Sequence, residues 1–82
     1  MNTEEVADRI EAELPDAEAE VRTPRDPDDD DHYAAVVVSP AFEGKSLVDQ
    51  HQLVHDALDE YLTDEIHAIE LETYTPEEYE GR

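Results

Sequence analysis

The apolar residues of this chain fall in short periodic blocks, and these blocks limit what it can fold into. Val6, Ile10 and Leu14 recur every four residues, which indicates one apolar stripe on a helix. The nearly unbroken apolar run at 33–38 indicates a strand. A chain of 82 residues can bury one small core and no second one, so we expect a single domain over residues 1–82.

Acidic residues dominate the rest of the sequence. There are 25 Asp and Glu against five Lys and Arg, which gives a formal net charge of −20. A disordered acidic protein would contain few aliphatic residues, whereas the aliphatic residues here are periodic, so we expect a folded domain with an acidic surface. Such a charge is typical of adaptation to concentrated salt, because the Debye length falls to about 3 Å at 1 M and screens self-repulsion. The composition therefore predicts folding that needs molar salt.

Several classes of protein are excluded or disfavoured by what the sequence lacks. It contains no cysteine, so any metal must be bound through His, carboxylate or a partner. Carboxylates are too abundant for any pair to indicate glycosidase or phosphatase chemistry, and no phosphate-binding glycine loop is present. No apolar run approaches the roughly 20 residues that span a bilayer, and no signal peptide is visible. A cytoplasmic protein without membrane association is the expectation.

Caps, prolines and changes of period divide the chain into a regular order of elements. The expected segments are a helix capped by Asn2 or Thr3 and closed by Pro15, a strand at 17–21, an exposed acidic loop at Arg22–Asp31, a strand at 33–38, a helix from Leu47, a strand at 66–74 and a last helical turn opened by Thr75 and Pro76. Two helical segments over one face of a three-stranded sheet make an α+β two-layer sandwich.

The long predicted helix has one marked face. Leu47, His51, Val54, Leu58 and Tyr61 follow one another at steps of four and three residues. Because this spacing keeps side chains on one side of a helix, we expect these five to be buried. A histidine on such a face is more often a core residue that holds a hydrogen bond than a metal ligand.

An ordered series of motifs between His32 and Tyr79 resembles the BolA family. The series comprises a strand ending at Ser39, the Phe-Glu-Gly-Lys turn at 42–45, a helix that carries His51, and the Ile-His-Ala segment at 66–68. The resemblance implies a class II KH-like fold, α-β-β-α-α-β, in which the first two strands form a hairpin that carries the acidic loop and a short helix precedes the long one. It also implies a non-enzymatic protein that pairs with a monothiol glutaredoxin over a shared [2Fe–2S] cluster.

The same resemblance assigns roles to individual residues. From the sequence alone, His67 is more readily a strand-end residue that bonds a carbonyl, but the BolA resemblance implies that it is a cluster ligand. The hairpin loop of the family supplies a second ligand, for which His32 is the candidate, although another group there is an open alternative. Gly44, Lys45 and Ala68 are the expected partner contacts. Lys45 is the one lysine of the chain.

The helix offers a weaker metal motif. His51 and His55 have the His-x-x-x-His spacing that can chelate a divalent ion. The glutamate that would act as a general base in a zinc peptidase is absent, so we reject a peptidase site. The family usually has arginine on both sides of the first of these histidines, whereas here Gln50 and Gln52 stand there, which predicts a loss of positive charge from the surface that meets a partner.

Two other functions compete with the iron–sulfur reading. A nucleic-acid-binding transcription regulator would suit a KH-like fold, but the five Lys and Arg are scattered along the chain and the turn at 42–45 lacks Gly-x-x-Gly. Nucleic acid is therefore possible but disfavoured by charge. The third candidate is an acidic interaction module without any metal. The sequence leaves open whether the protein forms homodimers.

Overall fold

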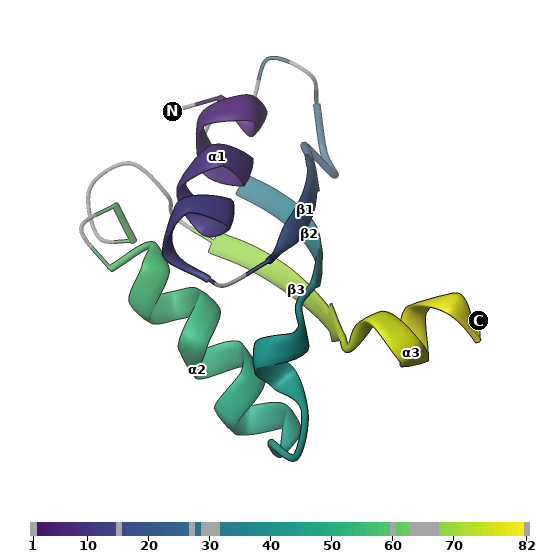
Figure 1. The fold of residues 1–82 in the computed structure, drawn as a ribbon. Helices are drawn as coiled ribbons and strands as arrows, with labels where there is room; N and C mark the ends of the chain where they lie inside the picture. Colours follow the sequence, from purple (N-terminus) through teal and green to yellow (C-terminus); the bar gives the residue numbers. More distant parts are fainter. Residues whose placement is uncertain are drawn as a thin grey trace.

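The computed structural model describes residues 2–14, 16–26, 28, 32–59, 61–62 and 68–81 (Figure 1). Its elements in chain order are α1 (Thr3–Glu13), β1 (Glu18–Arg22), β2 (His32–Val38), the 3-10 helix η1 (Pro40–Phe42), α2 (Leu47–Ala57), β3 (Ala68–Tyr74) and α3 (Pro76–Glu80). Each predicted helix and strand is therefore present. The short helix before the long one, which the BolA resemblance implied, is η1.

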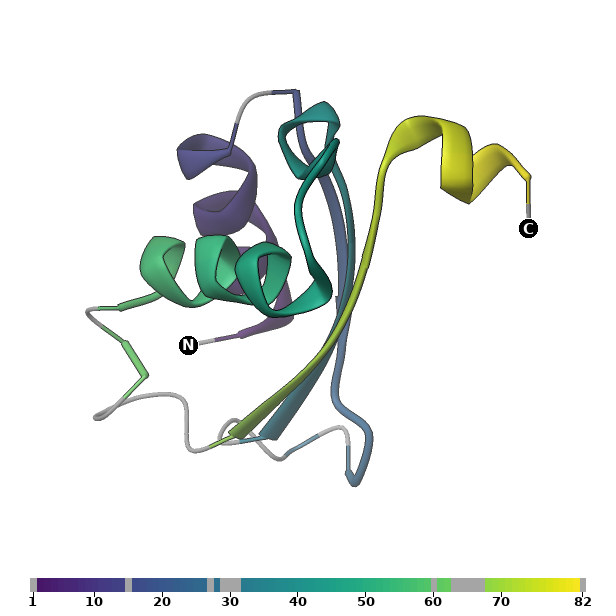
Figure 2. The ribbon, with the colours of Figure 1, turned by 90° about the horizontal axis from the view of Figure 1, so that it is seen from below.

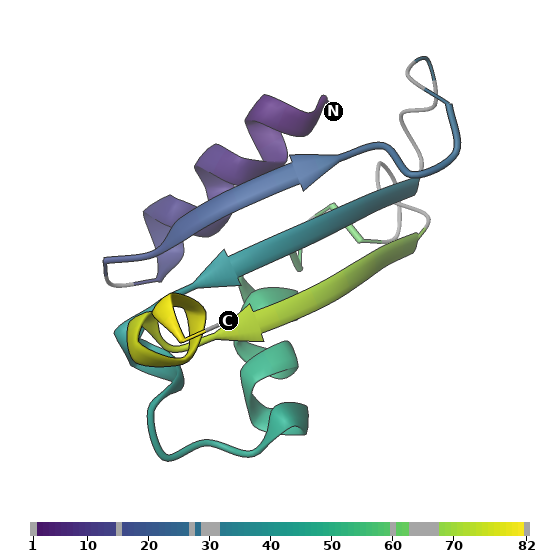
Figure 3. The ribbon, with the colours of Figure 1, turned by 90° about the vertical axis from the view of Figure 1, so that its right-hand side faces the viewer.

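The sheet has three strands in the order β1-β2-β3 (Figure 3). β1 and β2 are antiparallel, which confirms the expected hairpin, and β2 and β3 are parallel. Parallel neighbours need a crossover connection, and η1 with α2 provides it. As a result, β2 lies in the centre and is paired along both of its edges.

Two helices cover one face of this sheet, which confirms the α+β two-layer arrangement. α1 and α2 lie together on that face, whereas α3 lies on the opposite side, near one end of the strands (Figure 2). Between the helices and the sheet, the core cluster consists of Val6, Ile10, Leu14, Tyr33, Ala35, Val37, Phe42, Val54 and Leu58. The stripe predicted for the first helix is thus confirmed.

Side-chain caps fix where the helices begin. Asn2 caps α1 by accepting a hydrogen bond from the backbone N–H of Glu5 at 2.8 Å, and Ser46 caps α2 in the same way. Thr75 and Glu78 form a reciprocal capping box at α3, with Pro76 in the first turn, as the sequence predicts. These bonds satisfy N–H groups that the first turn of a helix otherwise leaves without a partner.

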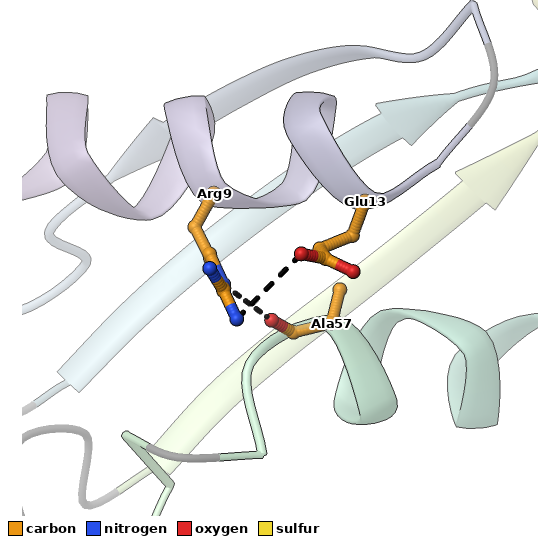
Figure 4. Close-up of polar contacts among 3 residues, drawn as sticks. All are labelled: Arg9, Glu13 and Ala57. Carbon is orange, nitrogen blue, oxygen red and sulfur yellow. Dashed lines mark hydrogen bonds and ion pairs between the residues drawn. The ribbon is translucent and has the colours of Figure 1, made fainter.

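Arg9 joins the two packed helices (Figure 4). Its Nε donates a hydrogen bond to the carbonyl oxygen of Ala57 at the end of α2, at 3.1 Å. A terminal nitrogen of the same guanidinium lies 3.6 Å from Oε1 of Glu13, and its central carbon lies 5.8 Å from the ring centroid of Tyr61. A cation thus sits at the C-terminal, negative end of α2, where it is favourable.

The buried face of α2 differs in part from the predicted one. Val54 and Leu58 are fully buried as expected, but Leu47 is 63% exposed and His51 is only partly buried. Gln50 is buried in their place, at 8% exposed. Leu47 is the first helical residue, one turn before Gln50, and the core does not extend to it. Tyr61 lies beyond the end of the helix.

The acidic connection between β1 and β2 is only partly within the described residues. Arg22 closes β1, and Pro24, Arg25, Asp26 and Asp28 are exposed as expected, whereas Pro27 and 29–31 lie outside the described residues. The predicted strand at 66–74 is described from Ala68 onward. In the part of the chain that the structure describes, no helix is long and apolar enough to cross a membrane.

Candidate metal centre

The parallel pairing of β2 and β3 brings two of the predicted site residues together. His32, the first residue of β2, is the register partner of Ala68, the first residue of β3. Both strands therefore begin at the same end of the sheet, although the two residues lie 36 positions apart in the sequence (Figure 3). His67 directly precedes Ala68 in the chain and lies outside the described residues.

A shallow depression marks this end of the sheet. Its volume is about 220 Å³, and it is lined by Pro24, Arg25, His32, Tyr33, Ala68 and Glu70. Tyr33 is only 1% exposed and anchors the start of β2 in the core. The partly buried His32 beside it borders the depression. An imidazole at a strand end thus adjoins space that another molecule can enter.

Among the described residues, few metal-binding side chains lie at this end of the sheet. No group of three or more metal-binding side chains occurs within the described ranges, and cysteine is absent from the whole sequence. Imidazole nitrogen suits iron and zinc, so this donor set fits a metal group that is shared with a partner.

The other predicted contacts lie elsewhere. Gly44 and Lys45 follow η1, which continues from the C-terminal end of β2, whereas His32 starts that strand. A seven-residue strand separates the two positions by roughly 20 Å. The structure therefore joins His32 with Ala68 and places Gly44 and Lys45, both exposed, beyond the far end of β2. Gly44 has a φ of 74°, which makes glycine the natural residue for that turn.

The histidines of α2 are not arranged as a metal site. The Nε2 atom of His51 is buried and has no hydrogen-bond partner among the described residues. The hydrogen bond expected of His51 is therefore not made through Nε2 within the described residues. His55 is partly buried one turn later, and the described residues supply no third donor to complete a site with this pair.

Gln50 lies inside the fold, whereas the sequence predicted it on the surface that meets a partner. Its Oε1 accepts a hydrogen bond from Oγ1 of Thr73 at 2.6 Å, and its Nε2 donates one to the carbonyl oxygen of Lys45 at 2.9 Å. It is therefore an internal link and not a surface position for meeting a partner. Of the two glutamines, Gln52 is the exposed one, and its Nε2 donates a hydrogen bond to Oδ1 of Asp56 on the same helix at 2.8 Å. The sequence did contain a signal of this burial, because Gln50 precedes the buried Val54 by four residues and so lies on the same face of the helix.

Comparison with known proteins agrees with this fold. A family model described as BolA-like protein matches residues 8–78. The chain is 36% identical over 81 residues to SufE-like protein 1 of Arabidopsis thaliana, covering 92% of this chain and 22% of that protein. It is 38% identical over 50 residues to the DNA-binding transcriptional regulator BolA of Escherichia coli, covering 61% of this chain and 48% of that protein.

A solved structure matches over nearly the whole length. The structure of a BolA homologue from Coxiella burnetii is 36% identical, with a TM-score of 0.85 and coverage of 98% of this chain and 97% of that one. The chain spans less than half of the two curated relatives.

Proposed function

Because this chain belongs to the BolA-like family, we propose that it is an iron–sulfur accessory protein that shares a [2Fe–2S] cluster with a monothiol glutaredoxin. The observation that carries the proposal is the pairing of His32 with Ala68 beside an open depression. This register puts Ala68, the last residue of the Ile-His-Ala segment, at the same end of the sheet as the start of β2. The family resemblance implies one ligand directly before Ala68 and another near the start of β2.

The proposed ligands from this chain are His67 and His32. Since the chain has no cysteine, the partner and a small thiol must supply the thiolate ligands. Imidazole ligation raises the potential of a cluster relative to thiolate ligation and makes its binding sensitive to pH. The role of this chain is to bind and hand over the cluster or to sense iron, and no catalytic step is proposed.

A spectroscopic experiment tests both ligands. Under anaerobic conditions the protein is mixed with cluster-loaded monothiol glutaredoxin, and the complex is followed by visible circular dichroism and native mass spectrometry. We expect a one-to-one complex with an altered cluster spectrum. His67→Ala and His32→Ala should each abolish the spectral change, since a cluster ligand is missing in each.

The matched control is His55→Ala, which removes an imidazole from α2 and should leave complex and spectrum unchanged. Far-ultraviolet circular dichroism checks that every variant is folded. If the spectrum and the complex survive in both the His67 and the His32 variants, the proposal is wrong. If only His67→Ala has an effect, the second ligand is another group of this end of the sheet.

A second function, nucleic-acid binding, is favoured by one relative, whose name describes a DNA-binding transcriptional regulator. Electrostatics oppose it here, because phosphate binding depends on clustered Lys and Arg. Arg9 already contacts Glu13, Ala57 and Tyr61 inside the fold. We expect a labelled duplex to show no change in fluorescence anisotropy with this protein in molar KCl, whereas saturable binding there would favour the regulator.

A further inference from the structure

The face of the sheet opposite α1 and α2 has an apolar centre with acidic borders. Because side chains alternate along a strand, Ala34, Val36 and Val38 of β2 point away from the core that holds Tyr33 and Val37. The register places each of them between one residue of β1 and one of β3. These cross-strand rows are Arg22–Ala34–Glu70, Glu20–Val36–Glu72 and Glu18–Val38–Tyr74.

Overlapping depressions follow β2 along this face and together make a groove. The first depression, at His32, and the second both include Glu70. The second and the third both include Val36. The third and the fourth both include Val38 and Tyr79. Each has a volume of about 210 to 230 Å³. We call the surface formed by Ala34, Val36, Val38 and the residues beside them in those rows the open-face groove.

The two ends of the open-face groove differ. At the Val38 end, Tyr79 of α3 lines it, and α3 stands on this side of the sheet (Figure 2). The Tyr79 ring also contacts Tyr74, with ring centroids 5.7 Å apart. At the other end the groove opens into the depression beside His32 and Ala68. An extended segment can therefore enter from that end and stop against α3.

The walls of the groove carry a net negative charge, because four glutamates line it together with Arg22 and Arg25. Glu18 and Glu20 on one wall and Glu70 and Glu72 on the other are all exposed, and none forms an ion pair with another described residue. Glu72 is held in place, since its Oε1 accepts a hydrogen bond from the Tyr74 hydroxyl at 3.1 Å. Acidic residues are common all over this protein, but here they stand in rows on both sides of an apolar strip.

We propose that the open-face groove binds an extended segment of a partner protein that is rich in Lys and Arg and carries small aliphatic residues between them. The aliphatic side chains contact Val36 and Val38, which are partly exposed, and the long basic side chains reach the glutamates of both walls. An extended segment that runs the length of the seven-residue strand β2 contains about seven residues. The inference does not rest on the proposed function, because it needs neither metal nor glutaredoxin.

Charge argues against the other occupants. A second copy of this chain would bring the same glutamates face to face, and its formal net charge is also −20. Nucleic acid would bring phosphates against these carboxylates. Like charges in direct opposition suppress a complex. A basic polypeptide is the occupant that turns both walls into attractive contacts.

Peptide binding to the metal-free protein tests the proposal. The probe is a labelled seven-residue peptide in which lysine and valine alternate, with blocked ends. Fluorescence anisotropy is measured at the lowest KCl concentration at which circular dichroism shows the native signal. We expect saturable binding that weakens as KCl is added, with amide shifts in nuclear magnetic resonance spectra centred on Ala34, Val36 and Val38.

Two matched comparisons separate the groove from general attraction to an acidic protein. Glu20→Gln with Glu72→Gln should weaken binding about threefold to thirtyfold, as expected for the loss of two exposed ion pairs. Glu4→Gln with Asp8→Asn changes the charge equally on exposed positions of α1 and should alter binding by less than about twofold. A peptide of the same composition, with lysines and valines in separate blocks, should bind more weakly.

Three results would overturn the proposal. One is an equal loss of affinity in both double variants, which would mean that only net charge attracts the peptide. Another is that the peptide shifts amide signals elsewhere in the protein but none of those of β2. The last is a stable dimer of the free protein in sedimentation that Glu20→Gln with Glu72→Gln changes, which would make a second copy the occupant of this face.

Discussion

At the scale of single residues, Gln50 shows how one polar side chain connects three segments. It links α2 to Thr73 on β3 and to the backbone of Lys45 in the turn before the helix. Gln50 and Thr73 are both buried. We expect Gln50→Leu to lower the free energy of unfolding by about 1–3 kcal/mol, because the buried Thr73 hydroxyl and the partly buried Lys45 carbonyl lose their partner. Urea denaturation at fixed KCl measures the change.

A double-mutant cycle controls this prediction. Thr73→Val combined with Gln50→Leu should cost less than the sum of the two single changes, since removing both partners leaves fewer groups unsatisfied. Gln52→Leu, on the exposed side of the same helix, should change stability by less than about 0.5 kcal/mol. Equal stability of Gln50→Leu and the wild type would show that the hydrogen bonds contribute nothing.

At the scale of elements, Arg9 couples the end of α2 to α1 (Figure 4). The guanidinium donates to the Ala57 carbonyl oxygen and lies over Tyr61, which follows the helix. We expect Arg9→Gln to destabilise the protein by about 1–2 kcal/mol, because a charged hydrogen bond and a cation–π contact are lost from a partly exposed site. Thermal unfolding followed by circular dichroism measures the loss.

Arg22→Gln is the matched control for Arg9→Gln, since it makes the same change of net charge on the exposed end of β1. It should alter stability much less than Arg9→Gln does. If both variants unfold at the same temperature, the loss reflects the overall charge and not the contact between the helices.

At the scale of the whole molecule, charge repulsion opposes folding. The formal net charge is −20, and the ion pair observed among the described residues joins Arg9 to Glu13 within one helix. Because the sequence has five Lys and Arg against 25 Asp and Glu, ion pairs can relieve little of the repulsion, which leaves screening by salt. We expect the native circular dichroism signal to rise with KCl and to be complete only near molar concentrations.

The salt requirement should itself depend on charge. Replacement of Asp26 and Asp28 by asparagine removes two exposed charges from the acidic connection and should move the midpoint of the titration to lower KCl. A full native signal of the unchanged protein in dilute buffer would contradict the prediction that folding needs molar salt.

What the sequence by itself determined was local. The stripe of Val6 and Ile10, the run from Tyr33 to Val38 and the cap at Thr75 predict their elements correctly, because helix periodicity, strand alternation and capping depend on residues a few positions apart. The likeness of the ordered motifs to the BolA family added the hairpin and the short helix before the long one. His67 stays a prediction.

Only the tertiary structure decided which distant segments meet. The burial of Gln50 in place of Leu47 depends on Thr73, which lies 23 residues further along the chain. The meeting of His32 with Ala68, and the apolar groove between two rows of glutamates, follow from the parallel register of β2 and β3. Long-range packing sets such pairings, and the residues near each strand carry no signal that identifies its neighbour.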